Sequence, residues 1–173
     1  MAWKASKHVT VTQNLYYGPD QADTDIRFWR AFSGSILQWA GEDLVIALAY
    51  DIGTERMVEQ RDSPRTFWTG SALFTRWHIA GPWAIAVWPE VYWDRNGRLT
   101  GSEQFIRSVT STLEYKVSFS ETNTVFRLEH RYDHSTGRQG GFFKGGEISP
   151  GVIGLVPEQH LVIFAAMWTF DSP

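Results

Sequence analysis

The stretch "PWAIAVWPEVYWDRNG", residues 82–97, places tryptophan at positions 83, 88 and 93. Because successive side chains of a β-strand point to opposite faces, Trp83 and Trp93 would share one face and Trp88 would lie on the other. Ten residues of a strand tilted by about 40° rise roughly 25 Å, close to the height of the lipid-facing band of a transmembrane β-barrel. The spacing therefore predicts that Trp83 and Trp93 mark the two surfaces of a membrane.

Length and composition narrow the possible classes of protein. The chain has 173 residues, and we expect a single β-barrel domain over residues 1–173. A net charge of −3 provides no basic surface for nucleic acid, and the absence of cysteine excludes disulfides, thiolate metal sites and a cysteine nucleophile. The longest apolar run, residues 44–50, is too short for a membrane helix, which needs roughly 18 to 20 residues.

The first ten residues, "MAWKASKHVT", contain no apolar signal region. For a protein of the bacterial outer membrane, we therefore expect that a signal peptide has been removed.

Turn-forming residues divide the chain into eight segments with strand character, and no segment of similar length has a sustained helical period. The expected strands are His8–Tyr17, Arg27–Trp39, Leu44–Glu55, Thr66–Ile79, Trp83–Asp94, Phe105–Ser118, Thr124–His134 and His160–Phe170. The connections alternate between long polar loops, which follow the odd-numbered strands, and short turns such as "AGED" and "AGP". This asymmetry is typical of outer-membrane barrels and predicts an all-β fold, an eight-stranded antiparallel up-and-down transmembrane β-barrel.

Four of the expected strands have one large apolar face and one small or charged face, whereas Arg27–Trp39 and Thr66–Ile79 fit poorly because serine and threonine lie on their apolar face. In the segment Thr124–His134, for example, Phe126 and Leu128 alternate with Arg127 and Glu129. Alternation alone does not tell which face is inside, because a soluble barrel buries its apolar side chains and a membrane barrel turns them toward lipid.

Aromatic residues at the two ends of the strands favour the membrane orientation. Four pairs lie ten residues apart on the same face of a strand, and the last strand ends with two aromatics on one face. We expect these residues to form two girdles at the membrane–water interfaces, where amphipathic rings are favoured. They are Trp29, Trp39, Phe67, Trp77, Trp83, Trp93, Phe105, Tyr115, Trp168 and Phe170.

The charged residues on the opposite face would line the lumen. The expected set is Arg30, Asp51, Glu55, Arg76, Glu90, Asp94, Glu114, Lys116, Arg127, Glu129, Arg131 and Asp133. Because unpaired charges are costly where water is scarce, these groups should form ion pairs across neighbouring strands. They could serve as a polar conduit for water or small ions, or as a salt-bridged plug; eight strands favour the plug.

Three features fit this pattern poorly. Arg107 and His130 lie at outward-facing positions, and although Arg107 could extend toward the interface, His130 has no evident role there. Pro89 removes a backbone donor from a central strand, so we expect a β-bulge near it.

The long segment "GRQGGFFKGGEISPG" lacks a phosphate-binding pattern and is expected to be a flexible surface loop.

Seven motifs in order, "LYYGPDQ", "FWRAF", "ALAYDIG", "VYWDRNGRLTG", "STLEYKV", "FRLEHRYDHS" and "HLVIFAAMWTF", resemble the putative β-barrel porin-2 family, the OmpL-like porins. The resemblance extends from Leu15 to Phe170. It implies an outer-membrane β-barrel with a pore-forming role, and an aromatic last strand that the insertion machinery reads. Members of the family are usually about twice this length, and the match corresponds to their C-terminal half.

The expected function is therefore that of an outer-membrane β-barrel of porin type with a narrow or plugged polar lumen, serving passive transport of small solutes or ions or acting as a membrane scaffold. We expect a monomer whose partner is the lipid bilayer or detergent, with no nucleic acid, cofactor or metal. Catalysis is not expected, because His130 and His134 would lie roughly 13 Å apart and no nucleophile is evident. The alternatives are a soluble lipocalin-like ligand-binding β-barrel and a surface-recognition barrel acting through its loops.

Overall fold

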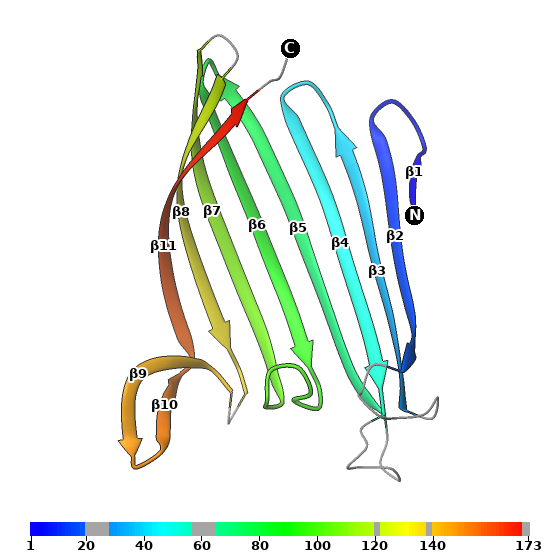
Figure 1. Ribbon diagram of the computed structural model, residues 1–173, viewed down its shortest axis with the longest axis vertical. Helices are drawn as coiled ribbons and strands as arrows, with labels where there is room; N and C mark the ends of the chain where they lie inside the picture. Colours follow the sequence, from blue (N-terminus) through cyan, green and yellow to red (C-terminus); the bar gives the residue numbers. More distant parts are fainter. Residues whose placement is uncertain (20–27, 57–64, 120–121, 138–139, 171–173) are drawn as a thin grey trace.

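The computed structural model describes residues 1–19, 28–56, 65–119, 122–137 and 140–170. The described chain consists almost entirely of antiparallel strands (Figure 1). Nine strands form one sheet in the order β1-β2-β3-β4-β5-β6-β7-β8-β11, and β9 and β10 form a separate hairpin.

Eight long strands make up the large sheet. They are β2 (Val9–Pro19), β3 (Trp29–Ala40), β4 (Leu44–Glu55), β5 (Thr66–Ala80), β6 (Trp83–Asp94), β7 (Gln104–Phe119), β8 (Thr122–Ser135) and β11 (Glu158–Phe170). Each predicted strand is found, and the boundaries of β4 and β6 are as expected. All consecutive long strands are neighbours in the sheet, including β8 and β11, which the hairpin separates in sequence, so the predicted all-β, antiparallel, up-and-down topology is confirmed.

Three short strands were not predicted. β1 (Ala2–Lys4) pairs with Thr10–Thr12 of β2. The segment expected to be a flexible loop contains β9 (Phe142–Ser149), which pairs with β10 (Val152–Val156) directly after it, so that expectation is wrong. The turn between these two strands has Gly151 at φ +77°, a backbone conformation that glycine adopts without strain, and this allows the hairpin to form.

The expected β-bulge at Pro89 is also absent. The β5–β6 ladder keeps one register from the pair Ala72–Glu90 to the pair Thr75–Val87, on both sides of Pro89. Its register shift lies between His78 and Ala80, beside the short turn.

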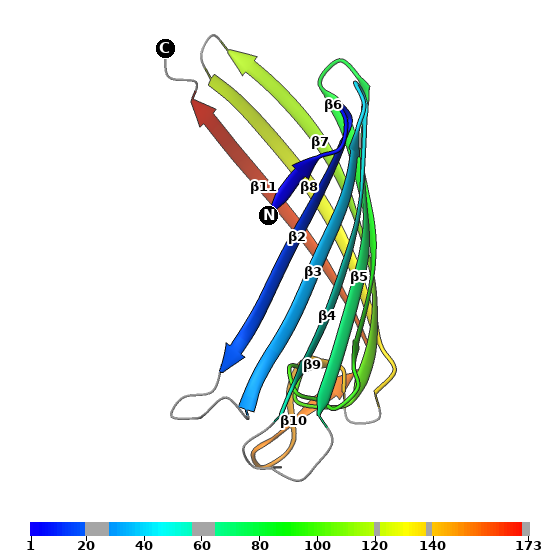
Figure 2. The ribbon, with the colours of Figure 1, turned by 90° about the vertical axis from the view of Figure 1, so that its right-hand side faces the viewer.

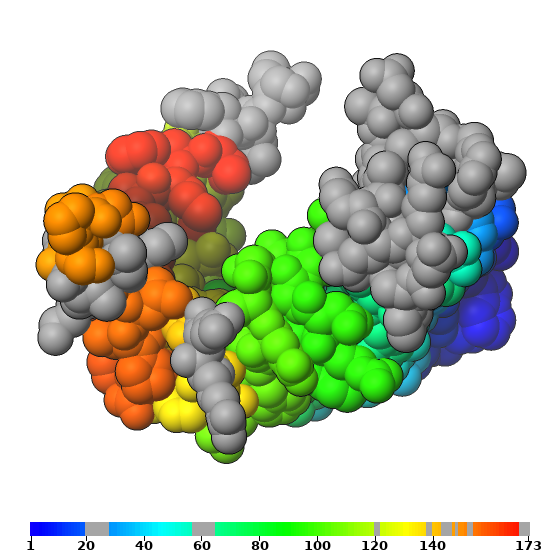
Figure 3. Space-filling view, turned by 90° about the horizontal axis from the view of Figure 1, so that it is seen from below, coloured from blue at the N-terminus to red at the C-terminus, as the bar shows by residue number. Residues whose placement is uncertain are grey.

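The sheet is strongly curved and open. Figure 2 shows the strands tilted across a curved wall, and in the view from below the described strands form a trough (Figure 3). The long strands β2 and β11 lie toward opposite edges, with β1 beside β2. The structure therefore shows an open sheet, and closure into an eight-stranded barrel stays a prediction.

The two ends of the sheet differ. The short turns at residues 41–43 and 81–82 lie at one end, and the Arg95–Glu103 loop and the β9–β10 hairpin lie at the other (Figure 1). We call these the short-turn end and the long-loop end. Among the described residues, no helix has the length and apolar character needed to cross a membrane.

Candidate lumen surface

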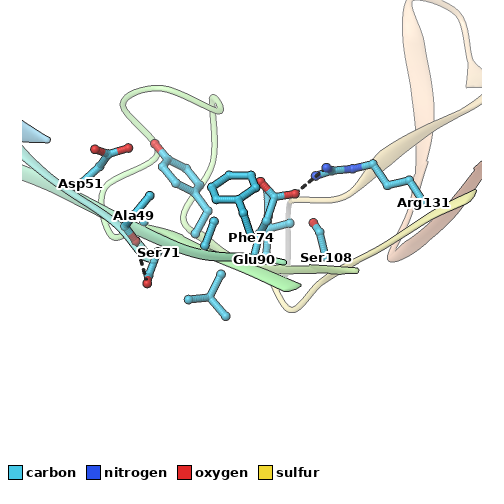
Figure 4. Close-up of a pocket in the computed structure, with 12 residues that line it drawn as sticks. Ala49, Asp51, Ser71, Phe74, Glu90, Ser108 and Arg131 are labelled. Carbon is cyan, nitrogen blue, oxygen red and sulfur yellow. Dashed lines mark hydrogen bonds and ion pairs between the residues drawn. The ribbon is translucent and has the colours of Figure 1, made fainter. Parts of the chain in front are cut away.

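The two faces of the sheet have opposite polarity. In β7, Thr110 and Glu114 are buried, whereas Val109 and Leu113, which alternate with them, are 43% and 41% exposed. Figure 4 shows Glu90 and Arg131 reaching toward each other on one side of the curved sheet, with Ser71 on the other. The face that carries Glu90 and Arg131 is the concave face, and the apolar face is convex.

Glu114 of β7 is the centre of the first ionic group on the concave face. Its carboxylate accepts hydrogen bonds from Arg127 on the adjacent strand β8 and from Arg76 on β5, two strands away. The shortest N···O distances are 2.6 Å to Arg127 and 2.7 Å to Arg76. Ala84 and Ala86 lie in the intervening strand β6 and are buried. Their small side chains leave Arg76 room to reach across β6 to Glu114.

Arg131 of β8 is the centre of the second group. Its guanidinium donates to Glu90 on β6 at 2.5 Å and to Asp133 at 2.8 Å. Asp133 is buried and also accepts hydrogen bonds from Ser108 at 2.5 Å and from Gln159 of β11 at 2.7 Å. This group joins four neighbouring strands through their side chains.

The third group lies at the long-loop end, around Glu55 of β4. The buried carboxylate of Glu55 pairs with Arg30 of β3 at 2.7 Å and with Arg98 of the Arg95–Glu103 loop. Nearby, Trp68 packs over Gly53, where a Cβ atom would lie 2.1 Å from the indole ring. Only glycine can occupy position 53 beside this ring.

Asp94 ties the same loop to the end of β6. Its carboxylate is completely buried and accepts hydrogen bonds from the backbone N–H groups of Arg98, Leu99 and Thr100 at 2.8–2.9 Å. The Thr100 hydroxyl donates to it as well, at 3.1 Å. Asp94 thus holds a folded loop, a different role from the cross-strand ion pair expected for it.

The remaining predicted charges are more open. Glu129 accepts a hydrogen bond from Thr112 at 3.0 Å, and Lys116 and Asp51 are exposed on the same face. Asp51 and Glu90 both line a concavity of about 380 Å³ that also includes Phe74 and Tyr92 (Figure 4). The structure therefore brings most of the predicted charges into three groups on one face.

Sequence reasoning missed several partners of these groups. Arg98 and Gln159 come from a loop and from a strand end, and Ser108 is a neutral member of a polar face. Their positions within polar segments were the only available signal, because none of them continues an alternation of charge.

The predicted interface aromatics lie on the convex face in two rows. Trp29, Phe67, Trp93 and Phe105 are near the long-loop end, and Trp39, Trp77, Trp83, Tyr115 and Trp168 are near the short-turn end. Rings on adjacent strands are in contact: the Phe67 and Trp93 centroids are 6.0 Å apart, and those of Trp83 and Tyr115 are 4.7 Å apart. The side chain of Phe170 lies outside the described part of the structure. Whether the two rows meet membrane interfaces stays a prediction.

Beside the long-loop row, Arg65 precedes β5 and covers the ring of Trp29, with its guanidinium carbon 3.3 Å from the ring centroid. Burial lowers the pKa of Arg65 and the nearby charge of Arg56 lowers it further.

In the described part of the chain, no group of three or more histidine, aspartate or glutamate residues could hold a metal ion.

Comparison with known proteins identifies the family. A family model described as "Putative beta-barrel porin-2, OmpL-like" matches residues 1–170. The chain belongs to this family of β-barrel porins. The match begins before Leu15, where the recognisable motifs start, and the correspondence with the C-terminal half of family members stays a prediction. No curated protein and no solved structure matches the chain. Family membership implies a location in the outer membrane.

Proposed function

We propose that this porin-family protein is an outer-membrane β-barrel with a narrow polar lumen, through which small ions or solutes pass passively. The observation that carries the proposal is the opposite polarity of the two sheet faces. Ion pairs gather on the concave side, and Leu48 and Leu128 on the convex side are 48% and 52% exposed. A soluble lipocalin-like barrel would have the reverse arrangement, with these leucines packed inside.

Lipid imposes a further requirement on the sheet. Hydrocarbon offers no hydrogen-bond partners, so each unpaired backbone group at an open edge costs several kcal/mol, and sheets span membranes as closed barrels. β2 and β11 run in opposite directions, as an antiparallel closing pair requires (Figure 1). We infer that these two edges pair in the membrane.

The register of the sheet suits this closure. The paired residues can be traced from β2 across the sheet to β11, and this path leads from Val9 to Val162. If β2 and β11 paired over their full lengths, Val9 would instead lie opposite Phe170. The difference between Val162 and Phe170, eight residues, is the stagger of the closed barrel. A stagger of eight over eight strands corresponds to a strand tilt of about 36°. In this register Leu15 faces Phe164, and the apolar faces of both strands are on the same side.

Closure also requires a local rearrangement. β1 pairs with Thr10–Thr12 along the edge of β2 that β11 would occupy. The pairing with β11 must therefore displace β1, which contributes only three residues to the sheet.

Disulfide cross-linking tests the closure, because the chain has no cysteine of its own. The double variant Leu15→Cys/Phe164→Cys, refolded into lipid vesicles and oxidised, should form an internal disulfide that changes its mobility on a non-reducing gel. The pair Leu15→Cys/Leu128→Cys is the matched control and should stay uncrosslinked. A disulfide-linked dimer would instead mean that two copies close a wider barrel, and no cross-link would contradict the pairing of these edges.

The state of the lumen is tested by conductance. The three ionic groups are completed by neighbouring strands at most two apart and, for Glu55, also by Arg98 of the Arg95–Glu103 loop, so no charge partner from the opposite wall is needed. We therefore expect small, stable conductance steps when the refolded protein is inserted into a planar bilayer. A folded, inserted protein without conductance would support the alternative, a plugged barrel that acts as a membrane scaffold.

A further inference from the structure

The convex face carries a polar cluster at the long-loop end, and it includes Arg107 and His130, the two outward-facing residues that fit the expected pattern poorly. We call it the convex polar cluster. It consists of Arg107 of β7, His130, Tyr132 and His134 of β8, and Glu158 and His160 of β11. Elsewhere the central part of this face is formed mainly by apolar and hydroxyl side chains, so the cluster requires an explanation.

Strand register brings the members together. Arg107 pairs with His134, which pairs with Glu158 on its other side. The Arg107 guanidinium Nη2 lies 3.5 Å from His134 Nδ1, and His130 Nε2 lies 3.1 Å from His160 Nδ1. The rings of His130 and His160 are stacked, with centroids 5.4 Å apart, and the ring of Tyr132 lies 4.9 Å from that of His160.

The charges of the cluster are only partly compensated. In the described structure, Arg107 has no ion pair with a carboxylate, although Glu158 belongs to the same cluster. Arg107, Tyr132, His134 and Glu158 line a shallow depression of about 460 Å³ on the convex surface. The guanidinium of Arg107 and the imidazole of His134 therefore lie together at this open depression.

The position of the cluster indicates its surroundings. Phe105 lies two residues from Arg107 toward the long-loop end, on the same face, and is paired with Trp93 in the long-loop aromatic row. In the membrane orientation proposed above, on which this inference rests, the row lies at the level of the lipid headgroups. An arginine at this depth contacts the phosphates of the lipid headgroups. Its planar guanidinium can donate two hydrogen bonds to two oxygens of one phosphate.

We propose that the convex polar cluster binds the phosphate of an anionic lipid in the leaflet on the long-loop side. Arg107 supplies the charge and His134 supplies an N–H donor, since both line the depression, and the His130–His160 pair lies on the same strands beside it. The carboxylate of Glu158, which lines the same depression, opposes an anion. A phosphate monoester, which carries more negative charge than a phosphodiester, is the headgroup chemistry that suits this site best.

Thermal unfolding in detergent micelles tests the proposal. The refolded protein is heated in micelles that contain phosphatidic acid, phosphatidylcholine or neither, and in plain micelles with inorganic phosphate. Unfolding is followed by the loss of the compact band on an unboiled gel. Phosphatidic acid should raise the midpoint by about 2–4 °C, as expected when a ligand binds only the folded state. Phosphatidylcholine and inorganic phosphate should leave it unchanged.

The variants Arg107→Gln and His134→Gln should abolish this shift and still fold. Arg95→Gln is the matched control, because it removes the same charge from the same end of the molecule but outside the cluster, and it should keep the shift. An equal shift with phosphatidylcholine, a shift with inorganic phosphate alone, or an equal loss in Arg95→Gln would each overturn the proposal. A chain that gives no compact band in any micelle would refute the membrane barrel itself, and the lipid site with it.

Discussion

Single carboxylates on the concave face connect several strands at once. Glu114 holds two arginines from different strands, and Asp94 holds three backbone N–H groups of one loop. A buried carboxylate that loses its charge leaves these donors without a strong acceptor, which costs more than the loss of an exposed ion pair. The contribution of such a carboxylate to stability therefore depends on how many hydrogen-bond donors its removal would leave unpaired.

The substitution Glu114→Gln tests this for the ion pairs. It should lower the free energy of unfolding by about 1–3 kcal/mol, below the usual cost for a fully buried pair because both arginines are partly exposed. Urea unfolding of the refolded protein in lipid vesicles, followed by tryptophan fluorescence, measures the change. Glu129→Gln is the control: it accepts one hydrogen bond from a neutral threonine, and its effect should be clearly smaller. Equal losses would show that Glu114 does not organise the group.

The substitution Asp94→Asn tests the loop. An amide cannot accept all the hydrogen bonds that the carboxylate of Asp94 receives, so the Arg95–Glu103 loop should open more often. Trypsin should then cleave after Arg95 or Arg98 several-fold faster than in the unmodified protein, as measured by mass spectrometry of the fragments. Asp43→Asn, in an exposed turn at the other end, should leave the cleavage rate unchanged. If Asp94→Asn also leaves it unchanged, Asp94 does not hold the loop.

At the scale of the element, each strand combines two environments. The period of two that places Leu113 outward and Glu114 inward runs through the whole of β7, and the neighbouring strands are in register with it. A shift of register by one residue would turn the concave-face charges of a strand toward the convex face. In a membrane this error would be costly, so the charges help to specify the register.

A lysine on the convex face should have a cost that depends on depth. Leu128→Lys, at the middle of β8, should destabilise the inserted protein by about 2–4 kcal/mol, whereas Phe119→Lys, at the end of β7, should cost about 0–1 kcal/mol. The folded fraction after refolding into vesicles over a urea series measures both. Leu128 and Phe119 are both exposed, so similar small effects would indicate that the convex face meets water and not lipid.

At the scale of the whole molecule, the exposed apolar face determines whether the protein stays monomeric in water or requires lipid or detergent. Among the described residues, the large exposed side chains include Leu48, Leu128, Phe164 and Trp168, and Phe164 is 70% exposed. A continuous apolar surface of this kind is rare on a soluble monomer and leads to association in water.

The refolded chain should therefore aggregate in plain buffer and stay monomeric in detergent micelles. Light scattering together with far-ultraviolet circular dichroism measures association and β-structure in the same samples. The detergent sample should also show a compact band that disappears on boiling. A folded monomer in plain buffer would contradict the membrane orientation and favour a soluble barrel.

The sequence predicted the eight long strands because each strand is long and bounded by turn residues, and most of them alternate between apolar and polar side chains. β4 and β6 were located without error for this reason. β1, β9 and β10 were missed since strands of three to eight residues in glycine-rich or terminal segments carry too few alternations to stand out. The twelve charged candidates followed from the same alternation, which assigns a face to each position but not a partner.

By itself, the sequence determined the class of fold, the order and direction of the strands, and which side chains share a face, because a period of two residues is a local property of the backbone. Only the tertiary structure decided which charges meet and how the outward-facing histidines cluster with Arg107, because these contacts depend on the register between strands and on the curvature of the sheet. Curvature brings side chains two strands apart within reach of each other on the concave face, as Arg76 and Glu114 are. Such distances are set by the whole sheet, and no single segment of the chain encodes them.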